Sequence, residues 1–159
     1  MPMLPEAIWR RRLESEFQQM AASGEHFEVD EMKMSYVISL RGVGLFKNGG
    51  SLDSLQKRES HSIQIDLKRE YPYAGGIDVT WLTPIFHPNI RSEDGKVCIQ
   101  LLNAWSEGTT IASLTKALKQ LLEKPNPNDA LNKEAADYFA MHPNALNETA
   151  VVKKPRVVV

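Results

Sequence analysis

The chain has 159 residues, with 19 Lys and Arg against 20 Asp and Glu and a formal charge of −1 at pH 7. This length is typical of a single domain, and the charge is not that of a strongly basic nucleic-acid-binding protein. The longest unbroken apolar run is 138–141, whereas a membrane span needs ~20 residues and a signal-peptide core about 7 to 15. We therefore expect a soluble cytoplasmic protein with no nucleic-acid or membrane partner.

The first half of the chain predicts one helix followed by a meander of strands. Trp9, Leu13, Phe17 and Met20 recur at helical spacing, and Ser23-Gly24 is a helix stop. Alternating apolar residues then predict strands over 27–29, 34–40, 63–67 and 77–81. Because no helical pattern separates these strands, an antiparallel sheet is expected. The Gly-, Ser- and Asn-rich segment 42–55 is predicted to be a long hairpin connection.

The second half predicts an irregular stretch and two helices. From residue 82 to residue 110 no periodic pattern is present, and a stretch of that kind inside a compact domain is usually functional. Apolar residues at helical spacing then predict a long helix from Ile111, which Pro125 ends at the preceding residue. A shorter helix is predicted over 131–141. The expected fold is α+β: N-terminal helix, four-stranded antiparallel meander, irregular stretch, long helix and short C-terminal helix.

Cys98 is the only cysteine in the chain. It has no partner for an internal disulfide, and the scattered histidines lack the paired spacing of a zinc site, so no metal or cofactor is predicted. The thiol follows an Asp94-Gly95 turn inside the irregular stretch, where reactive groups are common. The alternative is a buried cysteine that only packs.

The tripeptide His87-Pro88-Asn89 precedes this cysteine in the same stretch. The side-chain N–H of Asn89 has the chemistry to stabilise an oxyanion that forms when a thioester carbonyl is attacked. Alternatively, His87 and Asn89 only hold the loop through backbone hydrogen bonds. The tripeptide recurs at 142–144 with no cysteine after it, so alone it does not define a site.

Other polar residues have two interpretations each. Asp129 closes the proline-rich turn after the long helix, and it is either a site carboxylate or the N-cap of the following helix. Arg10, Arg11 and Arg12 on the first helix form either a solvated face or a contact with an acidic partner.

Several motifs follow one another in the chain: Tyr71-Pro72-Tyr73, His87-Pro88-Asn89, Gly95, Val97-Cys98, Trp105-Ser106, Ile111, Leu121-Leu122 and Pro125-Asn126-Pro127-Asn128-Asp129. In this combination the chain resembles the ubiquitin-conjugating enzyme family over about residues 5–141. The resemblance implies a catalytic core over 1–145 and a Val-rich basic tail over 146–159, in a minimal, divergent member that lacks the usual long last helix.

The activity that this resemblance implies is that of a carrier enzyme. Cys98 would receive the C-terminal carboxylate of ubiquitin or a ubiquitin-like protein as a thioester from an activating enzyme and pass it to a lysine amine. Asn89 would stabilise the oxyanion or order the loop, and His87 would brace the site. Asp129 would orient the lysine and help to deprotonate it, because a lysine amine has a pKa near 10.4 in solution.

The resemblance also implies two protein partners, the activating enzyme and a ligase of the RING type. The first helix with Arg10, Arg11 and Arg12, and the loops at Tyr73 and at Ser106, Glu107 and Gly108, would bind them. Gly75-Gly76 stands where the family usually has a Pro pair, Gln100 where an Asp is frequent, and Glu107-Gly108 where Pro-Ala is usual. Ligase choice is therefore expected to differ from familiar members. The ordinary apolar content of 42% is that expected of a monomer.

Two other functions compete with the carrier enzyme. One is a catalytically weak or inactive variant that binds a ubiquitin-like protein noncovalently, but such variants typically lack the cysteine that this chain retains. The other is a thiol hydrolase in which His87 activates Cys98, which requires the ring within about 3 Å of the sulfur.

Overall fold

The computed structural model describes residues 2–49, 52–97, 102, 105–128 and 130–146. Cys98, Gln100, Asp129 and nearly all of the predicted tail lie outside these residues. The elements in chain order are α1 (Glu6–Ser23), β1 (His26–Val29), β2 (Ser35–Lys47), a short 3-10 helix (Leu52–Ser54), β3 (Leu55–Leu67), β4 (Ile77–Trp81), α3 (Ile111–Glu123) and α4 (Lys133–Met141). The four strands pair in sequence order, each antiparallel to the next. The predicted α+β meander is confirmed.

Helix α1 buries one stripe against the rest of the molecule. Trp9, Leu13 and Met20 lie on that stripe, as predicted, and Gly24 ends the helix in the left-handed conformation, with φ of 82°. Glu16 also lies on the buried stripe, between Leu13 and Met20, and its side chain is 0% exposed. A buried carboxylate needs several donors, so this residue must organise its surroundings.

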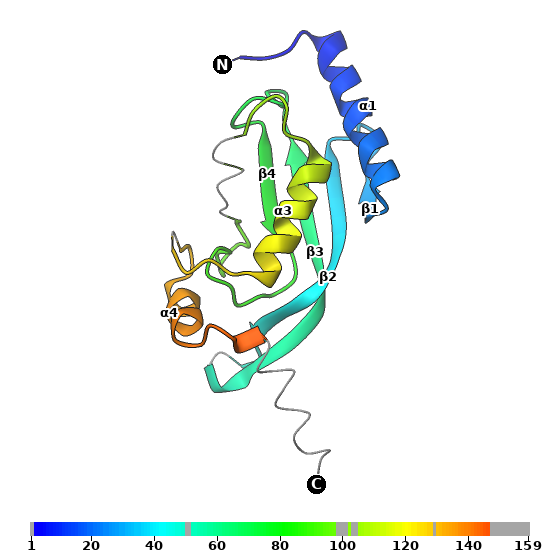
Figure 1. Ribbon diagram of the computed structural model, residues 1–159. Coiled ribbons are helices and arrows are strands. Elements are labelled where there is room, and N and C mark those ends of the chain that lie inside the picture. The colour runs from blue at the N-terminus through cyan, green and yellow to red at the C-terminus, as the bar shows by residue number, and fades with distance from the viewer. Residues whose placement is uncertain (1, 50–51, 98–101, 103–104, 129, 147–159) are drawn as a thin grey trace.

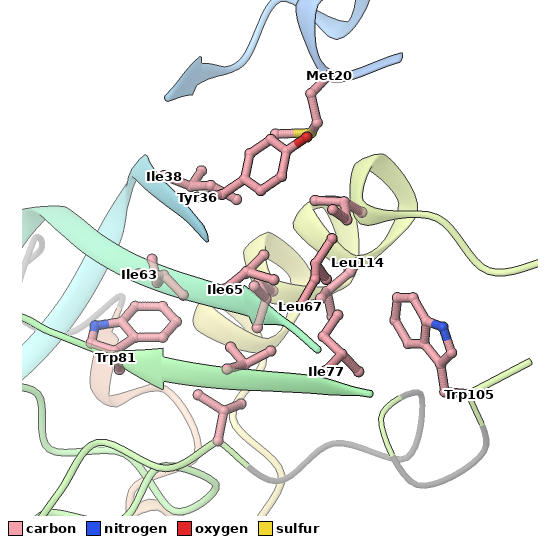
Figure 2. Close-up of a cluster of buried hydrophobic side chains, with 14 of the residues drawn as sticks. Met20, Tyr36, Ile38, Ile63, Ile65, Leu67, Ile77, Trp81, Trp105 and Leu114 are labelled. Atoms are coloured by element: carbon pink, nitrogen blue, oxygen red, sulfur yellow. The ribbon is translucent and has the colours of Figure 1, made fainter. Parts of the chain in front are cut away.

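Helix α3 lies across one face of the sheet and closes the main core (Figure 1). Figure 2 shows the side chains of α1, β2, β3, β4 and α3 converging there, with Trp105 at one border. Thr110 caps α3: its hydroxyl accepts from the Ser113 N–H at 3.1 Å, and the Ser113 hydroxyl oxygen accepts from the Thr110 N–H. The helix ends before Pro125, as its position predicts.

The long connection predicted over 42–55 is wrong, because β2 runs to Lys47 and β3 begins at Leu55. The strands continue as a two-stranded ribbon beyond a register shift between Arg41 and Gly44. A Cβ on Gly42 would lie 2.8 Å from Leu122 Cδ2 of α3, and a Cβ on Gly44 2.9 Å from His61 Cε1. Glycine is therefore present for close packing inside a ribbon, where its frequency had suggested a turn.

Helix α4 starts two positions later than the predicted segment and packs against the ribbon. Its N-cap is Asn132, whose side-chain oxygen accepts from the Ala135 N–H at 3.0 Å. The alternative role of Asp129 as the N-cap is therefore wrong. Helix α4 lies beside the ribbon (Figure 1). It completes a second hydrophobic cluster, separate from the main core, whose buried members are Leu45, Phe86, Ala135, Phe139 and Ala145.

Candidate active site

The segment that follows β4 carries the predicted site residues. Its residues 82–97 form only isolated β-bridges, as the missing periodicity predicted. Phe86 bridges to Leu45 of the ribbon, and the two residues of interest behind it are buried, with His87 2% and Asn89 3% exposed. Both side chains therefore point into the protein, and their partners decide what they do.

The His87 ring is engaged at both nitrogens. Its Nδ1 accepts from the Asn89 N–H at 3.0 Å, so the proton lies on Nε2, which donates to the Leu121 carbonyl oxygen of α3 at 2.8 Å. Burial lowers the pKa of His87 to about 4. A neutral ring with both nitrogens in backbone hydrogen bonds has no free lone pair for a proton from a thiol.

Protein stability should fall with acidification because of this ring. The folded-state pKa of about 4 lies below the ordinary value of 6.5, so the stabilising effect is complete above pH 6.5 and is lost as the pH falls toward 4. Between pH 7.5 and pH 5 we expect a loss of about 2 kcal/mol in unfolding free energy from His87. Urea unfolding at both pH values should show a smaller loss in His87→Gln. His61 of β3, whose pKa burial also lowers, keeps its own contribution. If His87→Gln lost as much unfolding free energy between pH 7.5 and pH 5 as the parent does, this account would be contradicted.

Asn89 connects the segment to the turn after α3. Its Oδ1 accepts from the Asn126 N–H at 2.9 Å, which orients the amide and leaves Nδ2 as its donor. The neighbouring Pro88 carbonyl oxygen accepts from the N–H groups of Leu131 and Asn132, at 2.8 and 3.0 Å. The tripeptide thus holds the chain on both sides of sequence position 129.

A hairpin leads from Asn89 to the residue before Cys98. Val97, 4% exposed, forms an antiparallel bridge with Ile90. Gly95 in the turn has φ of +78°, and a Cβ there would lie 2.1 Å from the Trp81 carbonyl oxygen. The Trp81 N–H donates to the Gly95 carbonyl oxygen at 2.7 Å. The hairpin is therefore fixed against β4 up to the residue that precedes the cysteine.

The predicted partner-binding residues gather at the opposite end from α4. There α1 begins, and the β3–β4 loop lies beside the 105–110 loop (Figure 1), with the Tyr71 and Trp105 rings 6.0 Å apart. Exposed residues at this end include Arg10, Arg11, Ser106, Glu107 and Gly108, whereas Tyr73 is half-buried.

Arg12 differs from its two neighbours because its side chain is only 20% exposed and pairs with Glu16 at 3.0 Å. The sequence interpretation gave no role to Glu16. Its place on the buried stripe of α1, four residues after an arginine, was the signal that could have indicated a buried ion pair.

Within the described part of the chain, no cluster of three or more His, Cys, Asp or Glu is placed to bind a metal ion. None of the described helices has the length and apolar character needed to cross a membrane.

The profile of the family described as "Ubiquitin-conjugating enzyme" matches residues 12–153. The chain belongs to the ubiquitin-conjugating enzyme family. Ubiquitin-conjugating enzyme E2 5 of Arabidopsis thaliana is 32% identical over 126 residues, covering 74% of this chain and 68% of the relative. Ubiquitin conjugating enzyme E2 B of Dictyostelium discoideum is 34% identical over 89 residues, covering 56% of this chain but only 60% of that relative.

Solved structures agree on the fold of this ubiquitin-conjugating enzyme family member. The E2 domain of a Toxoplasma gondii ubiquitin conjugating enzyme superposes with a TM-score of 0.67 at 22% identity, covering 89% of this chain and 93% of that one. A putative ubiquitin conjugating enzyme from Plasmodium yoelii gives a TM-score of 0.65 at 25% identity, covering 89% of each chain. The family and the fold expected from the motifs are thus confirmed.

Proposed function

We propose that this family member carries ubiquitin or a ubiquitin-like protein as a thioester on Cys98 and transfers it to a lysine amine. The observation that carries the proposal is the fixed Asn89 amide. Its Oδ1 is occupied by the Asn126 N–H, and Nδ2 is left as a donor. Ile90 and Val97 form a β-bridge with each other. Asn89 directly precedes Ile90 in the sequence, and Cys98 directly follows Val97.

The proposed chemistry has two acyl transfers. First, the Cys98 thiolate attacks the thioester that joins the modifier to the activating enzyme, and the activating enzyme's thiolate leaves. Second, a lysine amine attacks the new thioester, an isopeptide bond forms, and the Cys98 thiolate leaves. Each attack passes through an oxyanion that a donor such as Asn89 Nδ2 can stabilise. Asp129 is proposed to accept or orient the proton that the attacking amine loses.

The proposed partners follow from family membership. They are the modifier, an activating enzyme and a RING-type ligase. The last two are proposed to dock on the end formed by α1, the β3–β4 loop and the 105–110 loop. We also propose that the protein acts as a monomer in the cytoplasm. A noncovalent ubiquitin-binding role is the second candidate, and retention of Cys98, Asn89 and Asp129 favours the enzyme over it.

The structure supplies an argument against the thiol hydrolase. A general base needs a free ring nitrogen within reach of the thiol. In this protein the Asn89 N–H and the Leu121 carbonyl oxygen occupy the two nitrogens of His87. His87 therefore fits the bracing role.

A charging assay tests the proposal. The protein is mixed with ATP, an activating enzyme and its modifier, and the products are separated with and without reductant. We expect a reductant-sensitive band one modifier heavier, absent in Cys98→Ala and replaced by a reductant-resistant oxyester in Cys98→Ser. A Cys98→Ala variant that still forms the labile band would contradict the assignment of the thiol. No band with any modifier tried, together with modifier binding in solution, would favour the noncovalent role.

A further inference from the structure

Arg12 makes three hydrogen bonds within the protein, although it belongs to the cluster expected to meet partners. Its Nε donates to Glu16 Oε2 at 3.0 Å. Its Nη1 donates to the Glu107 carbonyl oxygen at 2.6 Å, and its Nη2 donates to the Thr109 carbonyl oxygen at 2.8 Å. The guanidinium also lies 5.3 Å from the centre of the Tyr71 ring. These three bonds use three of the five N–H donors of the guanidinium and hold it against the loop, so that only 20% of the side chain is exposed.

Glu16 is the fixed centre of this cluster. Its side chain is fully buried, and its Oε1 accepts from the N–H of Ile111, the first residue of α3, at 3.1 Å. A carboxylate at a helix N-terminus is favourable. Its Oε2 accepts from the Tyr71 hydroxyl. Burial, followed by the nearby Glu16 carboxylate, raises the pKa of Tyr71, so the hydroxyl stays protonated and donates. One carboxylate thus joins α1, α3 and the β3–β4 loop.

Within the described part of the chain, few other hydrogen bonds define the backbone of the 106–109 loop. The Thr109 N–H donates to the Ser106 carbonyl oxygen at 3.0 Å, and the hydroxyls of these two residues lie 3.2 Å apart. A Cβ on Gly108 would have no neighbouring atom within 4 Å, so glycine is not required there for space. Because Glu107-Gly108 lacks proline and includes a glycine, the loop has more backbone freedom than a Pro-Ala sequence would have. The two bonds from Arg12 restrict that freedom.

We propose that Arg12, Glu16 and Tyr71 form a positioning cluster that sets the 106–109 backbone for docking of the activating enzyme and the ligase. Arg12 then acts from within the protein, and the exposed loop makes the contact. The inference rests on the proposed function for the identity of the partners. The loop geometry itself belongs to the free protein and is measured without them.

Two variants separate positioning from direct contact. Arg12→Lys keeps a positive charge near Glu16, but a single amine does not reproduce the fork that binds two loop carbonyls. Glu16→Gln keeps the size of a side chain that no partner can touch and removes the charge that holds Arg12. Arg41→Lys is the control, because Arg41 donates to Ser60 on the sheet, at 2.8 Å, away from this loop.

The first readout is the free protein by nuclear magnetic resonance. Both cluster variants should shift the amide resonances of Glu107, Gly108 and Thr109. They should also raise the exchange rate of the Thr109 N–H, which is bonded to the Ser106 carbonyl oxygen, about tenfold, corresponding to about 1.4 kcal/mol. The control should leave these resonances unchanged. Unchanged loop resonances in both cluster variants would overturn the proposal.

The second readout is activity with and without partners. Both cluster variants should lose about tenfold in the rate of ligase-dependent transfer. The KM of the activating enzyme for each variant should be higher than its KM for the parent. Discharge of preformed thioester onto free lysine, without ligase, should stay within about twofold of the parent. An equal loss without ligase would place the defect in the active site and overturn the proposal, as would full ligase-dependent transfer. If the parent itself cannot be charged, the proposed function fails, and the loop resonances still decide the positioning role.

Discussion

Asn89→Asp is expected to lower lysine transfer about a hundredfold. The carboxylate retains an oxygen that can accept from the Asn126 N–H, so the 2.9 Å contact is preserved. It lacks the amide donor, and its charge opposes a developing oxyanion. The transfer of the modifier from the activating enzyme to Cys98 should fall less, because in that step one thiolate replaces another. The measurement is single-turnover discharge of preformed thioester onto free lysine, together with the amount of thioester formed.

Asn89→Ala serves as the comparison for this variant. It removes both the donor and the acceptor, and the N–H of the exposed Asn126 loses its bond to the side chain, at a cost of about 1 kcal/mol of stability. We expect Asn89→Ala to lose transfer as Asn89→Asp does, because both variants lack the amide donor. Parent-like transfer by Asn89→Asp would show that the asparagine only orders the loop.

Arg12→Ala is expected to lower the free energy of unfolding by about 3 kcal/mol. The cause is the carboxylate of Glu16, which is 0% exposed and would lose the positive charge 3.0 Å away. Urea unfolding at pH 7 with an unchanged m value measures the effect. Arg12→Ala combined with Glu16→Gln should recover part of the loss, because the buried charge is then gone.

The same helix supplies the control for this prediction. Arg10 pairs with Glu6 at 3.3 Å with the same i,i+4 spacing, but the two side chains are 53% and 69% exposed. Solvent screens such a pair, so Arg10→Ala should change stability by less than about 0.5 kcal/mol. Similar losses in Arg10→Ala and Arg12→Ala would show that burial of Glu16 is not the cause.

Much of the fold could be predicted because apolar periodicity reports one-sided burial. The stripe of α1, the alternation in β1 to β4 and the stop before Pro125 all gave the right element. The pattern failed where one-sided burial ends. In the ribbon beyond Arg41, the glycines are present because Leu122 and His61 pack closely against them. These contacts are distant in sequence, so no local pattern indicates them.

The site could be predicted less completely for a related reason. Motif spacing indicated His87 and Asn89, yet it could not show that their partners are backbone groups of Leu121 and Asn126. Arg12 was grouped with two exposed arginines because a run of like charges does not show which side chain points toward the protein interior. Arg12 contacts Glu16 and two loop carbonyl oxygens because of the way α1 packs against the rest of the molecule. The local sequence does not give this packing.

The second hydrophobic cluster is expected to make the proposed site less stable than the main core. That cluster joins α4 to the ribbon through Leu45, Phe86 and Phe139 and is separate from the main core. Small cooperative units open at a lower free energy than the global transition. Opening of α4 as such a unit would separate the Pro88 carbonyl oxygen from its two donors, the N–H groups of Leu131 and Asn132 directly before that helix. Heat should therefore inactivate the protein reversibly at temperatures where its main core is still intact.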